Sequence, residues 1–185
     1  MGLTDDVLCV DIPQACAGYV VGLMQSFMLL EHMEGKKVLL CTGETFCRGN
    51  KEKQEPPYYR APFGGDAANI TIVENGGQDK ICYEFHQDGS QRKCLVIPDG
   101  AFRNPMTVEQ IQNQIVRMPL TGVVLDGSTV FNFAQKEVPI LVDSLTKMAE
   151  TTKEDIDWFL FHQPNKFMLQ KLAERIGVPF EKMPM

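Results

Sequence analysis

Three apolar segments open this sequence in an order that restricts the fold more than any other feature. Residues 7–12 form a short apolar run that Pro13 ends, and residues 37–41 form a second run of the same kind. Between them, residues 17–34 have helix length and are apolar around most of the circumference, with Gly35 placed as a C-terminal cap. A strand, a helix and a strand in succession are typical of a parallel α/β layer. We therefore predict an α/β fold whose first helix is buried on nearly all sides.

The rest of the chain continues this alternation. Further strands are expected at residues 69–73, 81–86, 93–97 and 158–161. Helices are expected at residues 107–116, 131–150 and 165–176. Pro139 should kink or divide the second of these helices, and Gly177 should close the third. Residues 47–60 are predicted to be an exposed loop, and residues 63–68 and 87–90 to be turns. At 185 residues, the chain is one domain or an unequal pair of small ones.

Charge and cysteine content argue against several classes of protein. The chain has 18 Lys and Arg against 24 Asp and Glu, a net charge of −6, so no nucleic-acid partner is expected. No 18-residue stretch is free of polar residues, and the N-terminus has no signal-peptide pattern, so we predict a cytoplasmic protein without a membrane span. Six cysteines occur without a CxxC pair, which favours neither disulfides nor a zinc site. Four of them lie in predicted strands: Cys9, Cys41, Cys82 and Cys94.

Cys16 lies between the first strand and the long helix, flanked by Ala15, Ala17 and Gly18. A thiol at a helix N-terminus faces the positive end of the helix dipole, which favours the thiolate. The small neighbours let backbone N–H groups approach a substrate carbonyl oxygen, as in an oxyanion hole. Because most free cysteines are simply packed in the interior, the functional interpretation requires a catalytic partner.

The most suitable partner is His162, which follows a predicted strand. Asn165 comes three residues later, where it can cap the next helix, and α/β proteins place their sites where strand ends meet helices. An isolated histidine is more often structural. His32 should be solvated at a helix end, and His86 has no residues converging on it. We therefore expect the loops that hold Cys16 and His162 to converge.

Five segments match, in order, the motifs of a known enzyme family. They are DIPQACAGYVVGL at 11–23, VLLCTGETF at 38–46, FGGDAANITIV at 63–73, LDGSTVFNFAQKEVP at 125–139 and DIDWFLFHQPN at 155–165. They resemble the nucleophile segment, the strand after it, the FGDGAGA turn, the MDGxxVFxFA segment and the HQAN histidine motif of ketoacyl-acyl-carrier-protein synthase III. This family of condensing enzymes belongs to the thiolase superfamily. The resemblance therefore implies a thiolase-like layered α/β fold.

The resemblance also implies which part of such a fold the chain forms. Residues 1–76 would be part of the N-terminal thiolase-like half, and residues 77–185 part of the C-terminal half. The family's first strands and helices, and its GNTSxAS-type segment with a second catalytic Asn, have no counterpart in the sequence. We therefore expect an incomplete fold, a fragment or split-gene half, that forms a homodimer or pairs with a complementary chain.

By the same resemblance, the activity would be acyl transfer followed by decarboxylative Claisen condensation, in fatty-acid or polyketide-like biosynthesis. The implied site residues are Cys16 and His162 as catalytic residues, Asn165, Ala17 and Gly18 as supporting ones, and Lys166 as a carrier-protein contact. Cys16 would take the acyl group from acyl-coenzyme A, and His162 would donate a hydrogen bond to the malonyl thioester. Lys166 would contact the acyl carrier protein or be an ordinary solvated lysine. No metal or nucleotide cofactor is implied, because the coenzyme A thioester is a substrate.

Two alternatives remain open. A related member of the superfamily would transfer the acyl group to oxygen or nitrogen through the same acyl-enzyme. A non-catalytic half would only pair with another chain, because sheet edges without a partner tend to acquire one. We also expect this chain alone to condense poorly, since only one of the two donors for decarboxylation has a counterpart. The acyl chain length is not determined by these residues.

Overall fold

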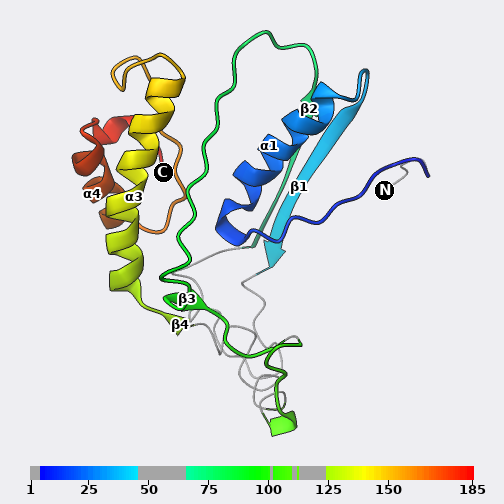
Figure 1. Ribbon diagram of the computed structural model, residues 1–185, viewed down its shortest axis with the longest axis vertical. Helices are drawn as coiled ribbons and strands as arrows, with labels where there is room; N and C mark the ends of the chain where they lie inside the picture. Colours follow the sequence, from blue (N-terminus) through cyan, green and yellow to red (C-terminus); the bar gives the residue numbers. More distant parts are fainter. Residues whose placement is uncertain (1–4, 46–65, 101, 110–111, 113–123) are drawn as a thin grey trace. The chain divides into compact units, whose positions relative to one another are not determined.

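The computed structural model describes residues 5–45, 66–100, 102–109, 112 and 124–185 (Figure 1). These residues divide into two compact units. The first comprises residues 5–45 and 66–79, and the second comprises the described residues from 80 to 185. A division into two thiolase-like halves after residue 76 stays a prediction. None of the described helices combines the length and the apolar composition needed to cross a membrane.

The first unit is one helix on a two-stranded sheet. It contains the short 3-10 helix η1 (Ala15–Ala17), helix α1 (Gly18–Glu31), and strands β1 (Lys37–Thr45) and β2 (Asp66–Glu74). The strands pair antiparallel, from Lys37 opposite Glu74 to Thr45 opposite Asp66. Figure 1 shows α1, in blue, lying along the two strands.

All three elements contribute to the core of this unit. Leu30 of α1, Leu40 of β1 and Val73 of β2 are buried. The helix packs closely against the sheet at Gly22, where an added β-carbon would come within 2.6 Å of Leu40 Cδ1. One turn later, the buried Ser26 hydroxyl donates a hydrogen bond to Gly22 O at 2.7 Å. A residue without a side chain therefore sets the distance between helix and sheet.

The first unit departs from the sequence-based expectations in three ways. Residues 7–12 are irregular instead of forming a strand, because no described strand pairs with their backbone groups. The expected parallel pairing of residues 7–12 with residues 37–41 is therefore wrong. Strand β1 instead pairs with β2, and that pairing is antiparallel. Helix α1 ends at Glu31 and is buried on one face only; Val20 on another face is 64% exposed. A sheet of two strands covers only one side of a helix.

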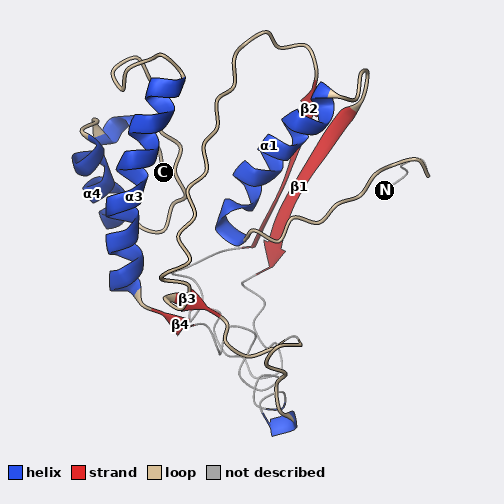
Figure 2. Ribbon diagram, in the orientation of Figure 1, coloured by secondary structure: helices blue, strands red, loops and turns tan. Residues whose placement is uncertain are grey.

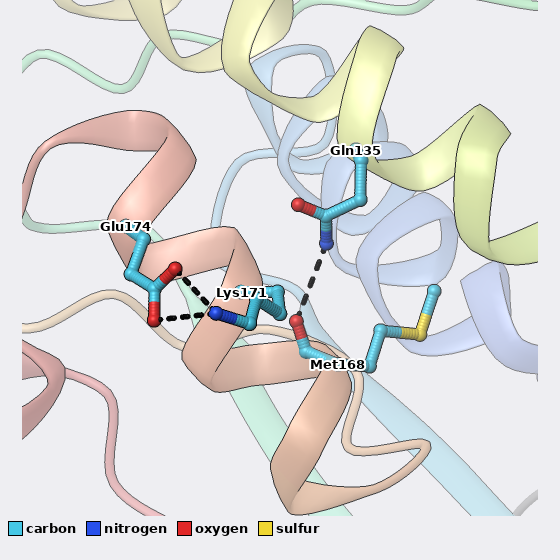
Figure 3. A network of polar contacts seen from close by, with 4 residues as sticks. All are labelled: Gln135, Met168, Lys171 and Glu174. Atoms are coloured by element: carbon cyan, nitrogen blue, oxygen red, sulfur yellow. Dashed lines mark hydrogen bonds and ion pairs between the residues drawn. The ribbon is translucent and has the colours of Figure 1, made fainter.

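The second unit is built around two packed helices (Figure 2). It contains strands β3 (Leu95–Val96) and β4 (Val124–Leu125), helices α3 (Gly127–Met148) and α4 (Lys166–Ile176), and the 3-10 helix η3 (Phe180–Lys182). Strands β3 and β4 form a short antiparallel pair. The buried core consists of Val142, Phe159, Leu169, Leu172, Ala173, Ile176, Val178 and Met183. Gln135 of α3 adds a hydrogen bond to Met168 O of α4, at 3.3 Å (Figure 3).

A side-chain cap defines the start of α3. Asp126 accepts hydrogen bonds from Thr129 N–H at 3.1 Å and from the hydroxyls of Thr129 and Ser128, both at 2.7 Å. These bonds, led by the one from the Thr129 hydroxyl, lower the pKa of Asp126 to about 2. The helix therefore begins at residue 127, four residues before the expected start. Pro139 lies inside α3 and does not divide it.

Helix α4 confirms its prediction to within one residue. Asn165 is the N-cap, and its side chain accepts a hydrogen bond from Met168 N–H at 2.8 Å. Gly177 closes the helix in the left-handed conformation, at φ +81°. Both signals act within one turn of the helix, which is why the sequence was sufficient to predict them.

Two segments expected to be strands are described but have no strand partner among the described residues. They are residues 81–86 and 158–161. The side-chain alternation typical of a strand is nevertheless present in the second: Phe159 is 7% exposed and Leu160 is 78% exposed. The expected strand assignment is wrong for both, while the inward and outward faces of residues 158–161 follow the expected period.

The remaining expectations are partly met. The strand at residues 93–97 shortens to β3, and the turn expected at residues 87–90 lies at 90–93. In the helix expected at 107–116, residues 108, 109 and 112 are helical, while residues 110–111 and 113–116 lie outside the described ranges. The loop at 47–60 and residues 63–65 also lie outside them. Of the four cysteines expected in strands, Cys41 is in one, and Cys9, Cys82 and Cys94 are not.

Candidate active site

Cys16 lies at the corner of a tight turn that leads into helix α1. Two backbone hydrogen bonds close the turn, from Gln14 N–H to Ile12 O and from Ala17 N–H to Gln14 O, both at 3.0 Å. Ala15 has φ +44°, a left-handed conformation that non-glycine residues rarely adopt. The thiol of Cys16 is exposed. The turn thus presents a thiol at the N-terminal end of a 14-residue helix.

The backbone N–H of Cys16 is the best candidate for an oxyanion donor. Ala17 N–H bonds to Gln14 O, and Gly18 N–H bonds to Ala15 O, so both of these donors are used within the turn. None of the described residues accepts a hydrogen bond from Cys16 N–H. The first turn of α1 also contains no acidic residue, so an anion there would meet the positive end of the helix dipole without a competing carboxylate.

His162 lies on the outward side of a segment that is anchored in the core of the second unit. Phe159 and Phe161 stack on each other inside the unit, with ring centroids 6.3 Å apart. Leu160 and His162 alternate with them and are exposed. On the C-terminal side, the Asn165 cap fixes the start of α4. His162 is therefore exposed, while the residues on either side of it are held by packing against the core or by the Asn165 hydrogen bond.

The structure describes the predicted site residues in two separate groups. Cys16, Ala17 and Gly18 belong to the first unit, and His162, Asn165 and Lys166 belong to the second. Lys166 is exposed as the first residue of α4. The convergence of Cys16 with His162 stays a prediction.

A pair formed by His86 was missed by the sequence analysis. Its Nε2 lies 3.0 Å from Oε1 of Glu84, whose side chain is 18% exposed. Hydrogen bonds from Ser144 and, to a smaller extent, from His86 hold the pKa of Glu84 below its usual range. His86 also lines an open cavity of about 370 Å³ with residues of α3. The expectation that no residues converge on His86 is therefore wrong. The sequence signal for this pair was the spacing of Glu84 and His86, because side chains two residues apart in an extended segment lie on the same face.

Comparison with known proteins connects this chain to one family. The sequence model described as 3-oxoacyl-[acyl-carrier-protein (ACP)] synthase III C terminal matches residues 146–185. A beta-ketoacyl-[acyl-carrier-protein] synthase III from Synechocystis is 28% identical over 174 residues, which is 94% of this chain and 51% of the relative. A putative 3-oxoacyl-[acyl-carrier-protein] synthase 3 from Campylobacter jejuni is 28% identical over an alignment that covers 100% of this chain and 52% of the Campylobacter protein. A crystal structure of a 3-oxoacyl-(acyl-carrier-protein) synthase III has a TM-score of 0.72 and 30% identity, covering 91% of this chain and 51% of that one.

The chain is similar to the 3-oxoacyl-acyl-carrier-protein synthase III family.

The synthase III relationship confirms the thiolase-like α/β fold, which matches over about half of each solved chain. The chain spans about half the length of the curated synthase III relatives that it matches. Because the Campylobacter relative matches the whole chain, Cys16 and His162 both lie within the region of similarity. In the described part of the chain, no three His, Cys, Asp or Glu side chains are grouped so as to hold a metal ion.

Proposed function

We propose that Cys16 is the nucleophile of a synthase III acyl transfer. The single observation that supports this most strongly is its position: an exposed thiol at the corner of a strained turn, at the N-terminal end of α1. The thiolate attacks the carbonyl carbon of an acyl thioester, and the oxyanion that forms lies near the unused Cys16 N–H. When the tetrahedral intermediate collapses, the carbon–sulfur bond to coenzyme A breaks, coenzyme A leaves as its thiol, and the acyl group stays on Cys16.

In the second step, His162 assists decarboxylation of a malonyl thioester. Its Nε2–H donates a hydrogen bond to the thioester carbonyl as the carbon–carbon bond to the carboxylate breaks and carbon dioxide leaves. The resulting enolate attacks the acyl-enzyme carbonyl, which forms the ketoacyl thioester and returns the Cys16 thiolate. This step requires His162 to converge with Cys16. His162 is exposed next to the buried Phe159 and the partly buried Phe161, which supports a role for its side chain at the surface of the unit.

The partners that follow from this chemistry are acyl-coenzyme A and a malonyl-acyl carrier protein, in a cytoplasmic setting. Lys166 is exposed beside the histidine motif, and its charge complements an acidic carrier protein. The condensation step has two hydrogen-bond donors in the family, and only His162 is among these 185 residues. Because the loss of one such donor typically costs about 10²–10³ in rate, condensation by this chain alone should be near background.

Labelled acetyl-coenzyme A, with and without malonyl-acyl carrier protein, separates the two steps. We expect a slow gain of one acetyl group on the peptide that contains Cys16, and no gain in a Cys16→Ala variant. Cys41→Ala is the matched control, because Cys41 is exposed like Cys16. Rapid formation of ketoacyl product by the 185-residue chain would contradict the proposal for condensation, and acetyl label on Cys41 or Cys9 alone would contradict the assignment of the nucleophile. Product that forms with an alcohol or amine acceptor and without decarboxylation would favour acyl transfer to oxygen or nitrogen.

A second candidate function is that of a half that pairs with another chain. The face of the β1–β2 sheet that points away from α1 exposes Leu39, Ile70 and Ile72. Such a patch of apolar side chains on a sheet marks a surface that a partner covers. Size exclusion with light scattering would show a dimer, or a complex with a complementary synthase III chain. Substitution of Ile70 and Ile72 by Thr should weaken that association, and an unchanged association would exclude this face.

A further inference from the structure

The segment that carries His162 is held in place by the residues just after helix α4. Lys182 Nζ donates hydrogen bonds to Glu154 O at 2.8 Å and to Ile156 O at 2.6 Å. The carbonyl of Lys182 accepts a hydrogen bond from Phe159 N–H at 2.8 Å. Residues 182–184 therefore act as a short brace along the segment that leads to His162.

The brace also reaches the residue next to His162. Gln163 Nε2 donates a hydrogen bond to Pro184 O at 3.1 Å. Pro184 is a firm anchor because Met183, beside it, is 3% exposed within the core of the second unit. Between the stacked Phe161 and the Asn165 cap, this is the one hydrogen bond recorded among the described residues for positions 162–164.

We propose that Gln163 is a positioning residue for His162. The inference rests on the proposed function, in which His162 Nε2 must lie within hydrogen-bond distance of a thioester carbonyl. A donor that moves by about 1 Å can lose roughly 10² in rate. The backbone of His162 has a fixed neighbour on its N-terminal side, because Phe161 packs against the core. The Gln163–Pro184 hydrogen bond supplies the fixed point on its C-terminal side.

Two substitutions at Gln163 test this position. Gln163→Met has similar length and no donor, so it removes the bond with little change in volume. Gln163→Lys keeps a donor at similar reach and should restore the bond to Pro184 O. The matched control is Gln135→Met, which removes another Gln-to-carbonyl hydrogen bond in the same unit, the one to Met168 O (Figure 3).

Amide hydrogen exchange at residues 161–163 and 165 and the NMR signals of the His162 ring provide the readouts. Gln163→Met should speed exchange at these amides about two- to tenfold, as expected for the loss of one hydrogen bond, and should shift the ring signals. Gln163→Lys should return both toward the wild type, and Gln135→Met should leave the ring signals unchanged.

The proposal is overturned if Gln163→Met leaves exchange and ring signals as in the wild type. It is also overturned if Gln135→Met changes the His162 ring as much as Gln163→Met does, because the effect would then come from general loosening of the unit. Neither readout uses acyl transfer. Failure to acetylate Cys16 would therefore count against the proposed function, whereas these readouts would still decide whether Gln163 fixes the position of His162.

Discussion

At the scale of single residues, short-range hydrogen bonds decide where the helices of this chain begin and end. Asn165 and Gly177 bound α4 where the sequence predicts, because each acts on its own turn of backbone. Asp126 acts in the same way on α3, and the sequence-based start at residue 131 was late because it followed the apolar pattern instead of the cap. A Ser and a Thr two and three residues after an Asp were the missed signal.

The cap at Asp126 predicts a pH dependence. Its folded-state pKa of about 2 lies below 3.8, the ordinary pKa that an Asp side chain has in the unfolded chain. The ionised cap therefore stabilises the fold fully above the unfolded value, and this contribution is lost as the pH falls toward 2. Asp126→Asn keeps an acceptor for Thr129 N–H without a charge, so it should lose less stability than the wild type over that interval. Urea unfolding followed by far-UV circular dichroism measures the difference, and equal losses in both proteins would contradict the assignment.

At the scale of elements, helices were predicted better than strands. A helix satisfies its backbone hydrogen bonds internally, so local signals suffice, whereas a strand needs a neighbour. Residues 7–12 and 158–161 have strand-like composition, and neither pairs with a strand among the described residues. Sequence alone also overestimated the burial of α1, because the apolar pattern shows which side chains avoid water and not which element covers them.

The contact between α1 and β1 predicts opposite effects for two glycines. Gly22→Ala would place a β-carbon 2.6 Å from Leu40 Cδ1. The overpacking costs about 1–3 kcal/mol, and the better helix propensity of Ala returns about 1 kcal/mol, so we expect net destabilisation of roughly 1 kcal/mol. Gly18→Ala has its nearest neighbour at 3.9 Å and should be neutral or stabilising. Urea unfolding of both variants tests this, and equal stabilities would show that Gly22 does not set the spacing.

At the scale of the whole molecule, the proposed site draws its two catalytic residues from different units, which the sequence connects only through motifs. Cys16 and His162 could be selected from the sequence because each follows a predicted strand and opens a helix. Their convergence depends on tertiary packing between segments almost 150 residues apart, which no local pattern determines. The expectation that they converge comes from the similarity to synthase III proteins. The structure shows only that each side chain is exposed in its own unit.

The convergence can be tested by crosslinking. A His162→Cys variant treated with a short bifunctional maleimide should join the peptides that contain residues 16 and 162, because the proposed mechanism brings their side chains to one substrate. Lys171→Cys, an exposed position on α4, is the control and should join to Cys16 more slowly. Mass mapping identifies the joined peptides. Equal rates for the two variants would mean that the two loops do not meet in this chain.

The central claim is that Cys16 is the reactive nucleophile, and its most direct test is the order in which the cysteines of the folded protein are alkylated. Cys9 and Cys41 are exposed like Cys16, so accessibility alone would label all three alike. Because Cys16 lies at the N-terminal end of α1 and is the proposed nucleophile, limiting iodoacetamide followed by peptide mass mapping should find label on Cys16 before either of the other two. Label on Cys9 or Cys41 at an equal or greater rate would contradict the account.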